Sequence, residues 1–252
     1  MRSIVFAGAA VAALALAAAA PASAAALIHA YDFSADVGGY VIDHAGSADG
    51  QLLGGAAVSG GVLHLDGVDD YVQFGQHIVP NAGADFSVLL RVQIAASQAG
   101  IAEIISQGFS GASGFYIGTN GGAGFRLTDA HGAPGVALPS AGAFHNLLLT
   151  NGADGFNFYI DGAAPAFTAG KVTDFNTGTD TRLGRQFGGY SEFLGGQIDT
   201  LKIYDGVVSY DAATRVSAAP EPASWALMIL GFGGAATLLR RRRRDGGLPQ
   251  PA

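Results

Sequence analysis

Short apolar runs that alternate with polar residues recur along most of this chain, and they constrain its fold more than any other feature. Between residues 26 and 217 the runs are separated by Gly, Asn and Asp about every eight to twelve positions, without sustained helical periodicity. Alternation with a period of two indicates half-buried strands, and turn residues at this spacing are typical of a β-sandwich or barrel. Examples are residues 62–65, 71–74, 86–94, 156–160 and 198–204.

Two Asp-Gly pairs carry specific turn chemistry. Asp154-Gly155 lies between two apolar runs and Asp161-Gly162 follows the second of them. Asp-Gly is a strong signal for a tight hairpin turn. Neither a linker nor a fixed-period repeat divides residues 26–217. We therefore expect one all-β domain there.

The N-terminal 24 residues have a different character. A single basic residue, Arg2, precedes an apolar stretch over residues 4–20 and the small residues Ala22-Ser23-Ala24. This order is typical of a secretory signal peptide. We expect residues 1–24 to form a signal helix that engages the Sec translocon. Signal peptidase would cleave after Ala24, with Ala26 as the alternative.

A second apolar stretch, residues 223–239, lies between Pro220-Glu221-Pro222 and a run of arginines. As a single hydrophobic helix its 17 residues would span about 25 Å, just short of a bilayer core, and arginines can snorkel across a small deficit. The basic flank predicts that this end is cytoplasmic and that the domain 26–217 is in the periplasm. The run consists of Arg240, Arg241, Arg242, Arg243 and Arg244.

The tripeptide, the apolar stretch and the arginines together resemble the PEP-CTERM sorting signal of Gram-negative bacteria, over residues 219–244. The resemblance implies cleavage near the tripeptide by an exosortase, usually in cells that make exopolysaccharide. The polar tail, residues 245–252, departs from the pattern, because such tails commonly stop soon after the basic cluster. An ordinary C-terminal anchor that is never cleaved stays open as the alternative.

Charge and cysteine content exclude several function classes. The whole chain is 49% hydrophobic, much of it in the two terminal segments. The part between them holds 7 basic and 18 acidic residues, a formal charge of −11. Such a surface repels nucleic acid, and no basic stripe for phosphates is present. The chain has no cysteine, so neither disulfides nor thiolate chemistry contribute.

Three blocks of the middle segment carry a second resemblance, to the laminin-G-like, concanavalin A-like jelly roll. It covers nearly all of residues 26–217 and implies two packed antiparallel sheets of about six or seven strands each. Phe144 stands where the family usually has Trp before His, and it keeps an aromatic core anchor. The blocks are residues 31–33 with 43–50 and 61–72, residues 144–150 with 158–162, and residues 195–204.

Catalytic patterns are not found in the sequence. A glycosidase needs two carboxylates that flank the scissile bond. The hydrolases that resemble this fold carry a Glu-x-Asp-x-x-Glu strand, which has no counterpart here. The middle segment has two glutamates, Glu103 and Glu192, and neither has a carboxylate two or four positions away. The six histidines form no metalloprotease motif, and no Gly-x-Ser-x-Gly elbow is present. We expect no enzyme.

Asp199 is a candidate metal ligand. On an extended strand its side chain shares a face with Leu201 and Ile203, so we expect it to point inward. A buried carboxylate needs a cation or several hydrogen-bond donors. Related jelly rolls often hold a structural Ca²⁺ near the closing strand, and Asp32, on a first strand expected to pair with the last, is the second candidate ligand. The alternative is a carboxylate that only accepts hydrogen bonds.

The loop at residues 186–193 is the candidate ligand-binding loop. Phe187 and Tyr190 could provide a stacking platform for sugar rings, and Glu192 could accept hydrogen bonds from hydroxyl groups. The alternative is that Phe187 and Phe193 cover an edge of the sandwich.

These features predict an exported, non-enzymatic surface or extracellular-matrix protein, anchored first in the inner membrane, whose domain binds carbohydrate such as exopolysaccharide, or another envelope component. A purely structural matrix or adhesion protein without a small ligand, and a glycan hydrolase, are the alternatives. Two carboxylates facing each other across a groove would favour the hydrolase. Exposed aromatic rings without such a pair would favour binding.

Overall fold

The computed structural model describes residues 25–215, apart from 82, 99, 110, 176, 177 and 179. The expected signal helix 1–24, the sorting segment 219–244 with its apolar stretch 223–239, and the tail 245–252 lie outside the described residues. Within the described part of the chain, no helix has the length and apolar character needed to cross a bilayer.

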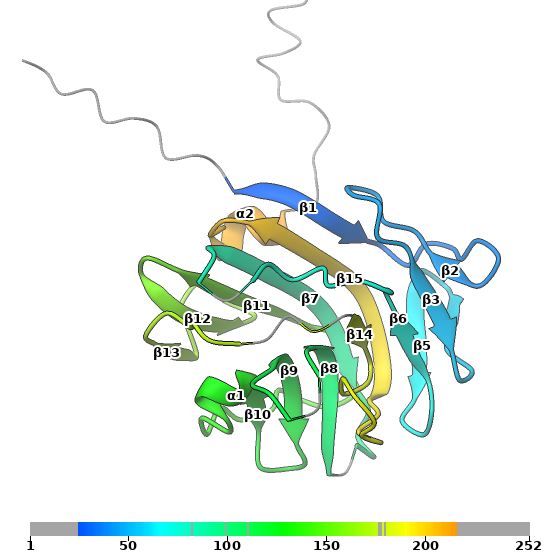
Figure 1. Cartoon of the computed structure of the whole chain (residues 1–252). Helices are drawn as coiled ribbons and strands as arrows, with labels where there is room; N and C mark the ends of the chain where they lie inside the picture. Colours follow the sequence, from blue (N-terminus) through cyan, green and yellow to red (C-terminus); the bar gives the residue numbers. More distant parts are fainter. Residues whose placement is uncertain are drawn as a thin grey trace, which may run out of the picture.

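The described chain folds into two antiparallel sheets packed face to face, as the alternating pattern predicts (Figure 1). Sheet A contains, in spatial order, β13 (Phe167–Ala169), β12 (Gly155–Ile160), β11 (His145–Gly152), β7 (Phe86–Ile94), β15 (Gly195–Asp205), β5 (Val62–Asp66) and β4 (Ala57–Ser59), with β1 (Ala26–Tyr31) also paired to β15. Sheet B contains β10 (Phe125–Leu127), β9 (Phe115–Asn120), β8 (Ile101–Gln107), β14 (Thr181–Leu183), β6 (Tyr71–Gln73), β3 (Gly50–Leu53) and β2 (Tyr40–Val41).

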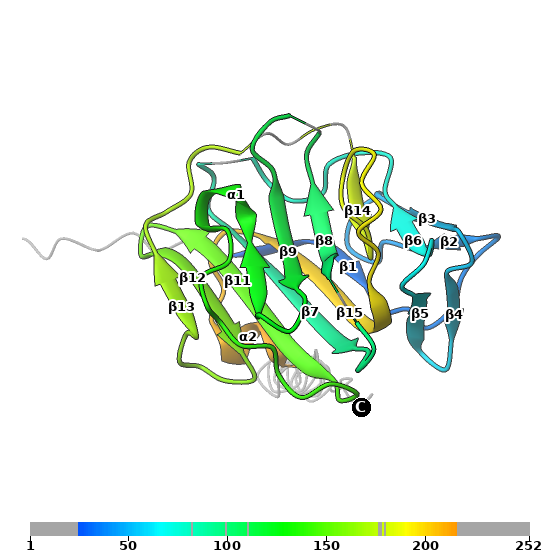
Figure 2. The same ribbon diagram turned by 90° about the horizontal axis from the view of Figure 1, so that it is seen from below.

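The sheets have eight and seven strands, so the expectation of about six or seven in each is one too low for sheet A. Two short helices complete the described elements, α1 (Thr128–His131) and α2 (Tyr210–Thr214). Figure 2, seen from below, shows the strands of sheet B in front of those of sheet A. The hairpin expected at Asp154-Gly155 is confirmed, because Gly152 pairs with Gly155, whose φ is +98°.

Alternate residues of both sheets fill one core between them. Phe86 of β7 lies 5.8 Å from Phe115 of β9, between ring centroids, and Phe125 of β10 lies 5.0 Å from Phe158 of β12. Each of these rings is fully buried. Burying aromatic rings of this size removes much apolar surface from water, and that burial favours the folded state. The side chains between these core positions therefore face the outer surfaces of the sheets.

The helix α2 covers part of the outer face of sheet A. Its Ala213 packs with Leu89, Leu148 and Tyr204, which are outward-facing residues of three adjacent strands. Ser209 caps the helix by accepting a hydrogen bond from the Ala212 amide. Since α2 lies at the end of the described chain and β1 at its beginning, both ends lie on the sheet A side of the sandwich (Figure 1).

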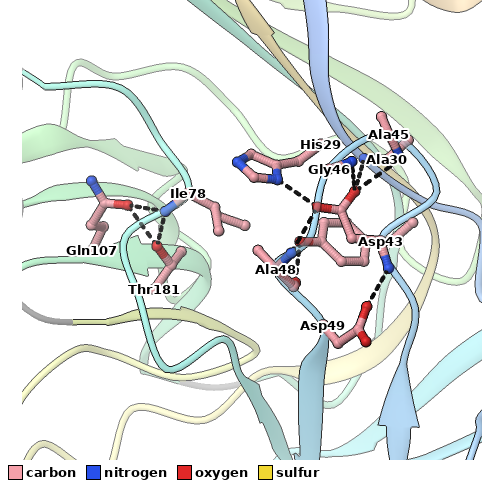
Figure 3. A network of polar contacts seen from close by, with 11 residues as sticks. His29, Ala30, Asp43, Ala45, Gly46, Ala48, Asp49, Ile78, Gln107 and Thr181 are labelled. Carbon is pink, nitrogen blue, oxygen red and sulfur yellow. Dashed lines mark hydrogen bonds and ion pairs between the residues drawn. The ribbon is translucent and has the colours of Figure 1, made fainter.

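Two buried polar networks fix the chain between the sheets (Figure 3). Asp43 closes the turn before β3. Its carboxylate accepts hydrogen bonds from the amides of residues 30, 45, 46 and 48. Gln107 of β8 accepts from the Ile78 amide at 3.1 Å, and Thr181 at the start of β14 accepts from the same amide at 2.9 Å. The second network holds β14 beside β8, next to the candidate ligand-binding loop.

Candidate functional site

The loop at residues 186–193 connects β14 to β15 and is tied back onto sheet B. Nη1 of Arg182 donates hydrogen bonds to the carbonyl oxygens of Gln186 and Gly188, at 3.2 and 2.6 Å. The Leu194 amide donates a hydrogen bond to the Gly184 carbonyl at 2.9 Å, which brings the two ends of the loop together. A guanidinium that binds two carbonyl groups holds the loop in one shape. The loop is therefore a fixed part of the outer surface of sheet B.

The expectation that Phe187 contributes to a stacking platform does not match its position. Its side chain is buried, with 3% exposed. The ring lies over Gly114, where an added Cβ atom would come within 2.2 Å of it, and against Gly108. Glycine at these two positions leaves the space that the ring occupies. Phe187 thus covers an edge of the sandwich, which is the alternative that the sequence left open.

Four other residues form what we call the Arg185 cluster: Tyr71, Arg185, Tyr190 and Phe193. The Arg185 guanidinium carbon lies 4.7 Å from the ring centroid of Tyr71 and 4.9 Å from that of Phe193, within cation–π range of both. Nε of Arg185 donates a hydrogen bond to the Tyr190 carbonyl at 3.3 Å. Tyr190 itself is 47% exposed. The cluster thus combines a guanidinium that lies over two rings with an exposed loop tyrosine whose backbone contacts it.

Tyr71 and Arg185 are functional candidates that the sequence analysis missed. Val72 of β6 pairs with Leu183 of β14, and both are fully buried, so the neighbouring Tyr71 faces outward. More than 100 residues separate Tyr71 from Arg185 in the sequence. Without the pairing of β6 with β14, the sequence offers only the proximity of Arg185 to the loop as a signal.

Glu192, the polar candidate of the loop, belongs to a group of charges beside the cluster. Its carboxylate lies 3.7 Å from Nη1 of Arg126, which also donates a hydrogen bond to Glu103 at 2.7 Å. The Arg126 guanidinium carbon lies 4.7 Å above the Tyr116 ring. Burial raises the pKa of Glu103 well above its usual value, and Glu192 and Asp129 raise it further, whereas Arg126 opposes the shift.

The two glutamates of the middle segment therefore meet in space, although they are far apart in the sequence. They do not face each other across an open groove, because Arg126 lies between them. The Glu103 side chain has no exposed area, and the Glu192 side chain is 24% exposed. A general acid must reach the glycosidic oxygen, and Glu103 cannot do so in this conformation.

The two candidate metal ligands line one groove on the outer face of sheet A, with a volume of about 620 Å³. The expectation that Asp199 points into the core is wrong. A β-bulge shifts the register of β15 between Ile198 and Thr200, so Ile198 and Leu201 both face the core although they are three residues apart. Asp199 lies on the outside and forms an ion pair with Arg91.

The groove does not fit a Ca²⁺ ion. Asp199 already has the Arg91 guanidinium as a partner, and Lys202 brings another positive charge to the same groove. Asp32 contacts Nε2 of His44 at 3.2 Å and accepts a hydrogen bond from the Ser34 amide at 3.0 Å. Ca²⁺ needs six to eight oxygen ligands, and cations among them oppose its binding. The expected pairing of β1 with β15 is nevertheless confirmed.

A group of three carboxylates elsewhere was not anticipated from the sequence. Asp66, Asp69 and Asp70 each offer one oxygen atom, and these atoms lie within 4.8 Å of one another. Asp66 accepts hydrogen bonds from the amides of Val68 and Asp69, and Asp70 accepts one from the Asp66 amide. These bonds shape the turn after β5, which is a common role of aspartate.

Comparison with known protein families decides the classification. Residues 66–212, more than half of the chain, match the family described as the concanavalin A-like lectin/glucanases superfamily. The chain belongs to this superfamily. Residues 218–244 match the PEP-CTERM protein-sorting motif, which contains Pro220-Glu221-Pro222 and the five arginines. The motif marks an exported protein that an exosortase sorts. Curated protein sequences give no match.

Solved structures share the sandwich at low sequence identity. Domain 4 of AbnA, a GH43 extracellular arabinanase from Geobacillus stearothermophilus solved in complex with arabinotriose, aligns with a TM-score of 0.59 and 18% identity, over 75% of this chain and 97% of that one. A sialidase of Trypanosoma rangeli aligns with a TM-score of 0.56 and 16% identity, over 73% of this chain and 31% of that one. The botulinum neurotoxin serotype D binding domain aligns with a TM-score of 0.53 and 13% identity, over 75% of this chain and 50% of that one. At these identities the likeness establishes the fold.

Proposed function

We propose that this protein is a non-enzymatic, carbohydrate-binding protein of the cell envelope or extracellular matrix, and that the Arg185 cluster is its binding surface. One observation carries the proposal: the Arg185 guanidinium lies over the rings of Tyr71 and Phe193 and contacts the backbone of Tyr190, a residue that is 47% exposed. Aromatic rings present flat apolar faces that match the C–H faces of sugars. The guanidinium supplies hydrogen-bond donors for hydroxyl and carboxylate oxygens.

The Arg185 cluster lies on the sheet that does not carry the C-terminal helix α2, and this position suits a domain that is anchored through its C-terminal segment. The cluster belongs to sheet B, whereas α2 lies on the outer face of sheet A and leads toward the sorting motif at residues 218–244 (Figure 1). A ligand-binding surface on the layer away from the tether stays accessible while the protein is held at a membrane. We propose that the domain is first presented in the periplasm and then moved by the exosortase to the cell surface or matrix.

Similar structures add support without deciding the ligand. Domain 4 of the arabinanase was solved in complex with arabinotriose, and the superfamily description names lectins. The glucanases in the same description keep the hydrolase alternative open. Against it stand the buried Glu103 and the guanidinium of Arg126 between the two glutamates.

A glycan array tests the proposal with the full-length chain in detergent. Tyr190→Ala should lose binding and keep its melting temperature, because Tyr190 is 47% exposed and lies outside the core. Glycans that the wild type binds should be recovered intact, without new reducing ends. Release of reducing ends that stops in Glu192→Gln would instead establish a hydrolase.

A purely structural matrix protein is the second candidate. The observation that favours it is the filled surface next to the cluster, where Phe187 covers the connection between β8 and β9 and the group of Glu103, Arg126 and Glu192 occupies the outer face of sheet B. If this candidate is correct, no glycan on the array binds above background. Fractionation of cells with and without the exosortase would then show retention of the protein in the matrix.

A further inference from the structure

We propose that the Arg185 cluster selects acidic glycans, and that Arg185 binds the carboxylate of a uronic acid unit. This inference rests on the proposed function and names the ligand class of the same surface. It concerns the charge of the sugar, which the fold does not specify.

The first argument is the pairing of the basic residues. Among the described residues, Arg91, Arg126, Lys171 and Arg182 each have a carboxylate within 4 Å. Arg185 contacts two aromatic rings and a carbonyl group, and it has no carboxylate within that distance among the described residues. Among the described residues, Lys202 and Arg215 also have no carboxylate within 4 Å, and of these three basic residues Arg185 is the one that lies over aromatic rings.

The acidic residue closest in sequence does not fill this position. Glu192 lies on the same loop, but its carboxylate is directed to Arg126 at 3.7 Å. The loop thus carries a carboxylate that neutralises a different arginine, and the charge of Arg185 stays available to a ligand.

The second argument is the orientation of the guanidinium. Nε is engaged by the Tyr190 carbonyl at 3.3 Å, so the two Nη groups form the edge that remains for an incoming acceptor. Such an edge matches the two oxygens of a carboxylate, and charge-assisted pairs of this kind are about twice as strong as neutral hydrogen bonds. The stacked rings hold the guanidinium in place, so little side-chain entropy is lost on binding.

Sulfate and phosphate esters offer the same oxyanion chemistry. The rings of Tyr71 and Phe193 have a centroid separation of 6.2 Å and are tilted by 52°, and the guanidinium lies against both of them. A carboxylate offers two oxygens in one plane with the Nη edge of the guanidinium, whereas a tetrahedral ester does not, so the planar pair favours the carboxylate. The exposed ring of Tyr190 would stack on the sugar that carries the carboxylate.

Titration calorimetry on the full-length chain in detergent tests the inference with three probes. The first probe is an oligogalacturonate, and the second is the same oligosaccharide with its carboxylates reduced to hydroxymethyl groups. The third is an oligosaccharide of equal length that has sulfate esters and no carboxylates. We expect the reduced and the sulfated probes to bind at least about tenfold more weakly than the uronate, which corresponds to the loss of one charge-assisted contact. The preference should decrease as salt increases.

Substitutions identify the residue responsible. Arg185→Gln should abolish the preference for the uronate, and Arg185→Lys should weaken it about fivefold or more, because a lysine cannot form the planar pair. Lys171→Gln removes the same charge from an ion pair with Asp85 elsewhere on the surface and should leave binding unchanged. The melting temperature of each variant shows whether it is folded.

The outcomes separate the two proposals. The inference is overturned if the reduced oligosaccharide binds as tightly as the uronate and Arg185→Gln changes the affinity for neither probe. Carbohydrate binding by the domain would then still stand. If the sulfated probe binds best, the site selects an oxyanion other than carboxylate and the inference is likewise overturned. If none of the probes binds, and the array also shows no ligand, the proposed function itself is wrong.

Discussion

Nδ1 of His29, on β1 of sheet A, lies 2.6 Å from Oδ2 of Asp43, in the turn between β2 and β3 of sheet B. The same carboxylate accepts hydrogen bonds from the Ala30 amide and from amides of its own turn. The contact therefore joins the first strand of sheet A to a turn of sheet B. The Asp43 side chain has no exposed area, so these contacts are shielded from water.

Asp43→Asn should lower the free energy of unfolding by about 2 kcal/mol or more, because an amide replaces a charged acceptor of several backbone amides. Chemical denaturation at neutral pH measures the effect. Asp36→Asn is the control: Asp36 is exposed and accepts one hydrogen bond, from the Gly39 amide, which asparagine can also accept. Equal stability losses in both variants would contradict this role for the Asp43 network.

The pH dependence of stability should reveal the same group. Burial opposes ionisation of Asp43, but the hydrogen bonds from His29 and the backbone amides outweigh it and lower its pKa from 3.8 to about 2. A group with a depressed folded-state pKa stabilises the fold above its unfolded-state pKa and loses that contribution as the pH falls. The stability difference between wild type and Asp43→Asn should therefore shrink between about pH 4 and pH 2. A difference that stays constant over that range would show that ionisation of Asp43 is not involved.

Gly114→Ala should destabilise the protein by about 1 to 3 kcal/mol, because the new Cβ atom would lie 2.2 Å from the buried ring of Phe187. Gly122→Ala serves as the control, since no atom lies within 4 Å of a Cβ at that position. A double-mutant cycle with Phe187→Ala should show that the cost of Gly114→Ala falls once the ring is removed. If the stability losses of Gly114→Ala and Phe187→Ala are additive, the Phe187 ring does not pack against Gly114.

Added Ca²⁺ should shift the melting temperature of wild type and of Asp199→Ala by the same amount. The ion pair of Asp199 with Arg91 lies partly exposed in the groove, and such pairs contribute about 0 to 1 kcal/mol to stability. Calorimetry with added Ca²⁺ and with a chelator measures the shift in melting temperature for both proteins. A Ca²⁺-dependent increase that is present in wild type and lost in Asp199→Ala would restore this residue as a metal ligand.

The sequence predicts the sandwich well because alternation and turn chemistry are local. The hairpin at Gly155 and the pairing of β1 with β15 are confirmed. The orientation of Asp199 was predicted wrongly because a β-bulge adds one residue to β15 and moves the side chain to the other face, and the local alternation does not reveal it.

The candidate site is less predictable because it depends on contacts between distant strands. Tyr190 and Glu192 were identified from the composition of their loop, but the burial of Phe187 depends on the glycines at positions 108 and 114 in another part of sheet B. The stacking of Arg185 on Tyr71 requires the pairing of β14 with β6. Neither relationship has a local sequence signal.

Binding to the native exopolysaccharide tests the central claim most directly. Purified polysaccharide from the producing cells would be immobilised, and retention of the full-length chain in detergent would be compared for wild type and Tyr190→Ala. We predict that wild type is retained and that the variant, with an unchanged melting temperature, is not. Equal retention of both proteins would contradict the assignment of the Arg185 cluster as the binding surface, and retention of neither would contradict carbohydrate binding by this domain.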